Sequence, residues 1–155
     1  MIPVVSYDHP DIYPTEEDYK QAFAQFESQC ENVVKNTTIM PEIKLVGELR
    51  RFDASLAMQT ILAAVPDADK EQLIAALNNF PGTGRRFERI TDGVYTDYGH
   101  HPIEIKATLE MARELKERDN YTGVVAIYEP HQNVRQHEIK DLYRDAFEAA
   151  DKIYW

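Results

Sequence analysis

The stretch VYTDYGHHPIEIKATLEMARELKERDNYTGVVAIY, residues 94–128, decides the fold that the sequence predicts. It starts with a short strand-like run at 94–97 and ends with a near-continuously apolar run at 123–128, as expected of a parallel strand covered on both faces. Between them, Pro102 suits a first helical turn, where its missing N–H costs nothing. The helix that follows has one face made of Ile105, Thr108, Leu109, Ala112 and Leu115.

The residues on either side extend this unit into an α/β pattern. Upstream, residues 86–90 form another strand-like run, and the turn TDG at 91–93 connects it to the run at 94–97, which is a hairpin signal. Downstream, we expect a helix over 138–150 and the start of a strand at IYW, 153–155. Strands and helices in this order predict a Rossmann-like, doubly wound α/β fold.

The first part of the chain reads mainly as helices. An apolar run at residues 2–5 is expected to be a strand, and Thr15 is expected to cap a helix that reaches Cys30. Three elements should follow: a strand at 43–46, a helix at 54–65 capped by Asp53, and a helix at 70–80 capped by Asp67 or Asp69. The turn-forming run FPGTG then places a domain boundary near residue 81, which divides the chain into 1–80 and 81–155.

Composition excludes several classes of partner. The chain has 17 Lys+Arg against 27 Asp+Glu, a net charge of −10. A nucleic-acid groove or an anionic-membrane anchor would need the opposite balance. We see no signal peptide and no apolar run of membrane-spanning length, and Cys30 has no cysteine with which to pair. The expectation is a cytoplasmic protein with no nucleic-acid or membrane partner.

Polar clusters containing histidine follow three of the expected strands. These clusters are DHPD at 8–11, TDYGHHP at 96–102 and EPHQNVR at 129–135. Ligands of open α/β sheets bind at the carboxyl ends of the strands, so the clusters predict a site at that edge. The alternative is that they are helix caps and core contacts in an acidic α/β domain.

The residue types limit which ligands such a site could take. His100 and His101 are adjacent, so their side chains diverge, which does not suit zinc. A histidine with carboxylates and nucleotide phosphates would suit magnesium better. No G-x-x-x-x-G-K-[ST] sequence occurs, so the chain has no phosphate cradle of that kind. The arginines after FPGTG could instead meet a phosphate from a rigid turn.

Four motifs resemble those of the Mur ligase family, the ATP-dependent amide-forming enzymes of peptidoglycan synthesis. YDHPDIY with EDYKQAF resembles a segment near the end of the family's central ATP domain, and VGELRRFDASLA resembles its G-x-H-N-x-x-N-A helix start. FPGTGRRFE and VYTDYGHHPIEIKATL resemble the arginine turn and the D-D-Y-A-H-H-P-x-E motif of the C-terminal domain. YEPHQNVR resembles the Q-P-H-x-x-x-R strand end.

The resemblance implies what each region of the chain is. Residues 81–155 would be a C-terminal Mur ligase domain, truncated at its end, and residues 1–80 a helical remnant of the central ATP-binding domain. The motifs are most like the branch that joins L-alanine to UDP-N-acetylmuramate through an acyl phosphate. The branch that recycles murein tripeptide is the alternative.

The resemblance also implies residues that would contact metal and nucleotide. His9 matches a histidine that helps to bind magnesium. Arg86 matches the arginine directed at the ATP phosphates, and Asp97 matches a hinge aspartate that contacts nucleotide. Asp53 stands where the family has an asparagine near the adenine.

A second set of residues is implied to contact the other substrates. Tyr98 and His100 match positions that line the muramyl and amino-acid site, with His100 the candidate catalytic residue. His131 and Arg135 match the strand-end pair that would hold the substrate carboxylate, which the bidentate fork of arginine suits.

Departures from the family pattern are equally informative. The P-loop and the N-terminal UDP-binding domain are absent, and Leu49-Arg50 replaces the family's His-Asn pair. We therefore expect the chain to be a part of a ligase that does not turn over ATP alone, with the missing domains as possible partners. A non-catalytic module that binds a muramyl nucleotide or a peptide is the alternative.

Overall fold

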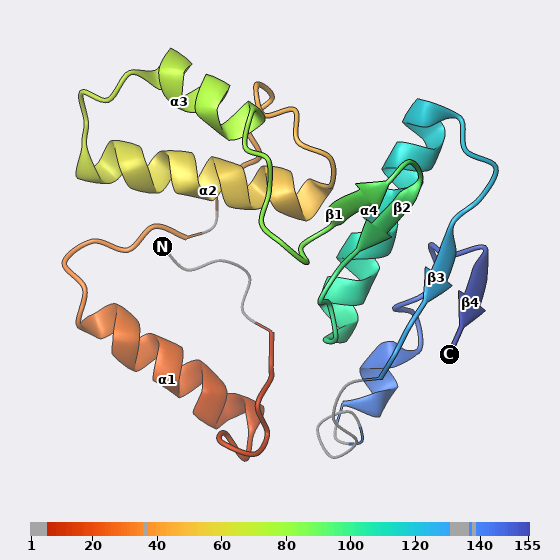
Figure 1. Ribbon diagram of the computed structural model, residues 1–155. Coiled ribbons are helices and arrows are strands. Elements are labelled where there is room, and N and C mark those ends of the chain that lie inside the picture. The colour runs from red at the N-terminus through yellow and green to blue at the C-terminus, as the bar shows by residue number, and fades with distance from the viewer. Residues whose placement is uncertain (1–5, 36, 131–136, 138) are drawn as a thin grey trace. The chain divides into compact units, whose positions relative to one another are not determined.

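The computed structural model describes the chain except for residues 1–5, 36, 131–136 and 138 (Figure 1). Contacts divide it into two compact units. The first contains Met1–Lys44 and Arg51–Asn78, and the second contains Leu45–Arg50 and Asn79–Trp155. Among the described residues, no helix combines the length and the apolar character that a membrane span would require.

The first unit is helical. Its helices are α1 (Glu16–Ser28), most of α2 (Glu48–Ala64) and α3 (Lys70–Asn78). Thr15 caps α1 as predicted, in a reciprocal pair of hydrogen bonds with Asp18. Asp69 is the cap of α3, because its carboxylate accepts the N–H of Gln72 at 3.0 Å. The best-buried side chains of this unit are those of Ile43, Ser55, Leu56 and Met58.

Two predictions for this unit are wrong. Residues 43–46 do not form a strand, because the side chain of Asn78 satisfies the neighbouring backbone: it accepts the N–H of Lys44 at 2.7 Å and donates to the carbonyl of Glu42 at 2.9 Å. Asp53 does not cap a helix, because α2 already begins at Glu48. The strand expected at residues 2–5 lies outside the described residues.

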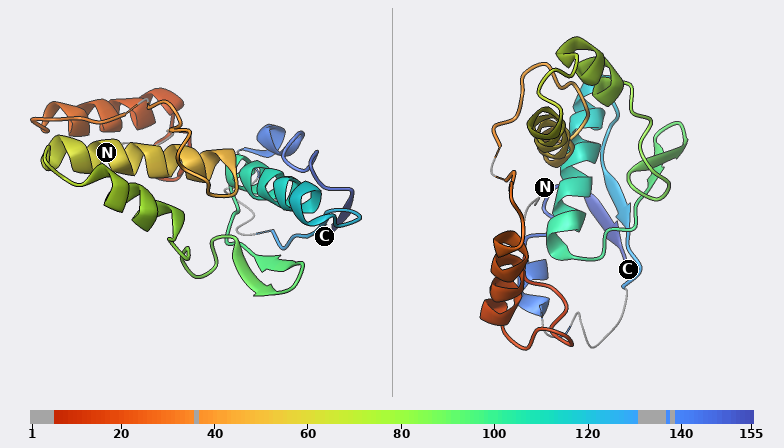
Figure 2. Two further views of the ribbon diagram at one scale, coloured as in Figure 1. Left: turned by 90° about the horizontal axis from the view of Figure 1, so that it is seen from above. Right: turned by 90° about the vertical axis from the view of Figure 1, so that its left-hand side faces the viewer.

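The second unit mixes strands and helices, which confirms the α/β class. Strands β1 (Glu88–Thr91) and β2 (Val94–Thr96) form the predicted antiparallel hairpin. Helix α4 (Pro102–Asp119) follows, and strand β3 (Val125–Ile127) pairs in parallel with β4 (Lys152–Tyr154). Figure 2 shows α4 running along the β3–β4 pair.

The apolar face of α4 forms the core of this unit, as its sequence period predicts. Ile105 and Leu109 pack with Val124, Ala146 and Phe147. A second cluster joins Met111 and Leu115 of α4 to Phe87. The helix thus connects the hairpin to the parallel strand pair.

The prediction that β3 is covered on both faces is wrong for the described residues. Ala126 pairs with Ile153 in register and packs on the core. Val125 and Ile127 are on the other face, 58% and 86% exposed. Strand β3 is therefore apolar on both faces but packed on one.

The helix expected over 138–150 is also absent from the described part of that segment. A short 3₁₀ helix, η1 (Lys140–Tyr143), is followed by turns. The N–H groups of Leu142, Ala146 and Ala150 each donate to the carbonyl three residues earlier. This tighter spacing replaces the i to i−4 bonds of an α-helix.

Candidate active site

Asp97 holds together the two segments that form the candidate site. One segment is the turn 82–87 before β1, and the other is the loop 97–101 between β2 and α4. The Asp97 carboxylate accepts the N–H of Phe87 at 2.7 Å and the N–H of Gly99 at 2.6 Å. The N–H of Tyr98 donates to the carbonyl of Arg85 at 2.8 Å. The turn and the loop therefore have a fixed relative position.

The backbone of the turn is in an uncommon conformation. Arg85 and Phe87 have φ values of 57° and 50°, in the left-handed region that residues with a Cβ rarely adopt. The contacts of Asp97 and Tyr98 hold the backbone there. Arg86 lies between Arg85 and Phe87, and half of its side-chain surface is exposed (52%).

Three residues implied by the resemblance come together here. The guanidinium of Arg86 is 5.9 Å from the centre of the Tyr98 ring, and that of Arg85 is closer, at 4.8 Å. The ring of Tyr98 meets that of His100 edge to face at 5.4 Å. A cation, a phenol and an imidazole thus face one another, which is a suitable set for an anionic or amine-bearing ligand.

Glu104, in the first turn of α4, joins these residues. Its Oε1 accepts a hydrogen bond from Nη1 of Arg86 at 3.2 Å. Its Oε2 accepts the backbone N–H groups of His100 at 3.1 Å and His101 at 3.2 Å. Burial opposes ionisation of this carboxyl group, but these N–H groups and the guanidinium together hold its pKa below the ordinary value.

His101 has a structural position. Only 6% of its surface is exposed, and its Nδ1 accepts the N–H of Ile103 at 3.3 Å, so it caps α4. With Glu104 it forms a capping box in which histidine takes the place of serine or threonine. The two adjacent histidines therefore have different positions: His100 lies at the candidate site, and His101 caps the helix.

Tyr143 supports the same loop from η1. Its hydroxyl donates to the carbonyl of His100 at 2.6 Å. The sequence reasoning missed both Tyr143 and Glu104. The H-x-x-E spacing before α4 was a signal for Glu104, because a cap is commonly followed by glutamate three residues later.

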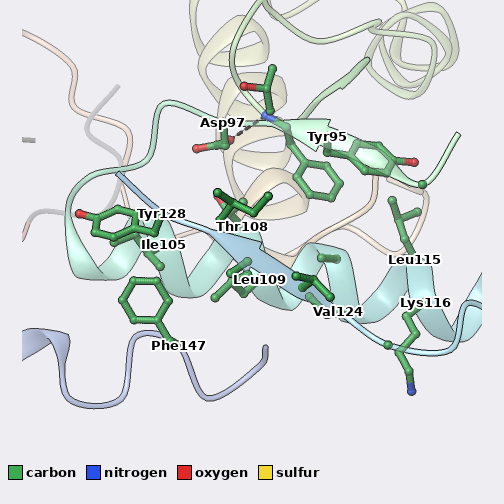
Figure 3. A pocket seen from close by; sticks show the side chains of 18 of the residues that line it. Tyr95, Asp97, Ile105, Thr108, Leu109, Leu115, Lys116, Val124, Tyr128 and Phe147 are labelled. Carbon is green, nitrogen blue, oxygen red and sulfur yellow. Dashed lines mark hydrogen bonds between the residues drawn. The ribbon is translucent and has the colours of Figure 1, made fainter. Parts of the chain in front are cut away.

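A pocket of about 320 Å³ lies beside Asp97 (Figure 3). Its walls come from the hairpin, from α4 and from β3, and they combine apolar side chains such as Ile105 and Val124 with polar ones such as Asp97 and Lys116. Figure 3 shows Lys116 at the end of the pocket opposite Tyr128. The pocket separates β2 from β3, which belong to different two-stranded sheets.

The remaining predicted site residues are elsewhere. His9 and Asp53 are in the first unit, and His131 and Arg135 lie outside the described residues. Asp53 is exposed as a residue, yet desolvation of its carboxyl group raises its pKa. The roles that the resemblance implies for these four residues stay predictions.

The described residues alone do not form a complete magnesium site. Among them, no three side chains of the metal-binding types converge on a point that could hold an ion. The ring of His9 lies near the carboxylates of Asp8 and Asp11, at 4.0 and 3.7 Å. Magnesium prefers an octahedron of oxygen atoms, which this arrangement does not supply.

Comparison with known proteins finds relatives that share one name, UDP-N-acetylmuramate–L-alanine ligase. The ligase of Campylobacter jejuni subsp. doylei is 38% identical over 124 residues, which cover 72% of this chain and 28% of that protein. The ligase of Gloeothece citriformis is 30% identical over 202 residues, with 99% and 41% covered. No family model matches the chain.

These similarities, together with the motifs that form the site, place the chain in the Mur ligase family. Within that family it is similar to the UDP-N-acetylmuramate–L-alanine ligases. The chain spans less than half the length of these curated relatives. The region aligned with the Gloeothece ligase is 202 positions long against 155 residues here, so that relative has internal segments that this chain lacks.

Proposed function

We propose that the chain is part of a cytoplasmic, ATP-dependent ligase that joins L-alanine to UDP-N-acetylmuramate. The observation that carries the proposal is the convergence of Arg86, Tyr98 and His100 around Glu104, in a chain whose relatives bear that ligase name. Residues 81–155 would then be the C-terminal, Rossmann-like domain, and residues 1–80 the end of the central domain.

The geometry is suitable for the chemistry of such a ligase. The muramyl carboxylate would take the γ-phosphoryl group of ATP and become an acyl phosphate, with ADP as the leaving group. The amine of L-alanine would then attack the acyl carbon, form the amide and release phosphate. Arg86 would donate hydrogen bonds to phosphate oxygens, and His100 would position the amine. ATP and magnesium would be bound together with parts of the ligase outside these residues.

Product binding tests this proposal directly. Isothermal titration of the 155-residue chain with UDP-N-acetylmuramoyl-L-alanine should give saturable binding, which Arg135→Ala should abolish if that guanidinium holds the carboxylate. Arg118→Ala is the matched control, because Arg118 pairs with its neighbour Asp119 at the end of α4. An affinity left unchanged by Arg135→Ala would show that the carboxylate site is assigned wrongly.

A non-catalytic binding module is the second candidate. It is favoured by Arg50 and Asp53 at the expected adenine positions. Phosphate release from ATP, UDP-N-acetylmuramate and L-alanine, assayed with the missing ligase domains added, separates the candidates, because only a part of a ligase should restore it. We expect none from this chain alone, and turnover would show that the P-loop is dispensable.

A further inference from the structure

Glu104 uses its two carboxylate oxygens for different purposes. Oε2 accepts the N–H groups of His100 and His101 and so completes the cap of α4. Oε1 is directed at Nη1 of Arg86, 3.2 Å away. Nδ1 of His100 is also near Oε2, at 3.6 Å. One side chain therefore reaches both the arginine and the histidine of the proposed site.

The contact between Arg86 and Glu104 does little for stability. The side chain of Arg86 is 52% exposed and that of Glu104 33% exposed, and exposed ion pairs contribute little to folding. Holding a long, exposed arginine in one orientation before a ligand binds increases the affinity, because the entropy cost of ordering the side chain is then not paid on binding. The arrangement thus favours ligand binding over fold stability.

We propose that Glu104 is a positioning residue that holds the Arg86 guanidinium and the His100 loop in the arrangement that meets the ligand. The proposal rests on the proposed function, since Arg86 and His100 are its binding groups. Glu104 itself would not touch the ligand. Its effect would pass through the Oε1 contact to Arg86 and the Oε2 contacts to the loop.

The variant Glu104→Gln separates the two purposes. The carbonyl oxygen of glutamine can still accept the N–H groups of the cap, whereas its NH₂ group cannot accept from Arg86. We expect unchanged helix content by circular dichroism. We also expect the affinity for UDP-N-acetylmuramoyl-L-alanine to fall by about tenfold, the order expected when a charged hydrogen bond is lost. Glu110→Gln, an exposed glutamate of the same helix, is the control.

A ligand-independent readout distinguishes this proposal from the proposed function. The ¹H–¹⁵N nuclear Overhauser effect of the Arg86 side-chain Nε, assigned with Arg86→Lys, should show an ordered group in the wild type and a mobile one in Glu104→Gln. If the wild type does not bind UDP-N-acetylmuramoyl-L-alanine, the proposed function fails, and the Arg86 signal still decides whether Glu104 orders this arginine. An equally ordered Arg86, or equal affinities in the two proteins, would overturn the positioning role.

Should Glu104→Gln fold poorly, Glu104→Asp replaces it. Aspartate keeps the charge and a cap acceptor but is one methylene shorter, so it withdraws from Arg86. The same loss of order at Arg86 is expected. Retained order in this variant would also contradict the proposal.

Discussion

Gly47 is the residue at which a single added methyl group should disturb the second unit most. Its φ is +90°, and a Cβ built on it would lie 2.2 Å from Cγ and 2.7 Å from Sδ of Met111. Its N–H also donates to Oε2 of Glu114 at 3.0 Å, so the backbone is held against α4 on two sides. Gly47→Ala therefore introduces both backbone strain and a steric clash.

The magnitude follows from two separable costs. Left-handed backbone costs a residue with a Cβ about 1–2 kcal/mol. Overpacking a filled site costs about 1–3 kcal/mol more. Gly82→Ala provides the matched control, because its φ is +89° but the nearest atom to its Cβ is Nη2 of Arg50 at 3.6 Å. We expect Gly47→Ala to lower the free energy of unfolding by roughly 2–5 kcal/mol and Gly82→Ala by roughly 1–2 kcal/mol.

Urea unfolding at 25 °C is the assay, followed by far-ultraviolet circular dichroism and by the fluorescence of Trp155, whose ring contacts Tyr128 and Phe147. Met111→Ala should relieve the clash, so the double variant with Gly47→Ala should lose less stability than the two single losses together. Equal losses for Gly47→Ala and Gly82→Ala, or simple additivity with Met111→Ala, would refute the packing argument.

Two further predictions concern contacts within the second unit. The N–H of Val124 and, to a smaller extent, the guanidinium of Arg113 hold the pKa of Asp151 below its ordinary value of 3.8. The ionised carboxylate therefore stabilises the folded state at pH values above 3.8, and this stabilisation is lost as the pH falls through the lower pKa of the folded state. Thermal unfolding from pH 6 to pH 3 should therefore show a steeper loss in the wild type than in Asp151→Asn, and parallel curves would contradict this. Tyr143→Phe removes the hydroxyl that donates to the carbonyl of His100, and it should lower the free energy of unfolding in urea by about 1 kcal/mol. An unchanged free energy of unfolding would contradict a stabilising role for this hydrogen bond.

Local sequence signals predicted the elements whose hydrogen bonds are local. Thr15 and Asp69 cap their helices, and the turn at 91–93 closes the hairpin, because each of these contacts spans only a few residues. The prediction of a helix over 138–150 is wrong because the hydrogen bonds that decide this segment are not local. Its apolar period is helical, but contacts with distant residues fix it in turns: Tyr143 bonds to His100, and Ala149 accepts a hydrogen bond from Arg113.

The candidate site was predictable to the extent that motifs encode it. The resemblance named Arg86, Tyr98 and His100, and the structure brings them together. It gave no indication of Tyr143, whose role depends on a contact across 43 positions of sequence. The prediction of Asp53 as a cap is wrong because α2 begins at Glu48, six residues before the predicted start at Ala54.

The motif positions of this chain divide into those that build the site and those that face a ligand. Gly47 packs against Met111, Asp97 uses both oxygens on backbone N–H groups, and His101 caps α4. A substitution at any of these would reduce binding by disturbing the scaffold, whatever the ligand. Loss of binding identifies a contact residue only where folding is intact, so Arg86 and His100, with their partly exposed side chains, are the positions at which substitution tests the chemistry itself.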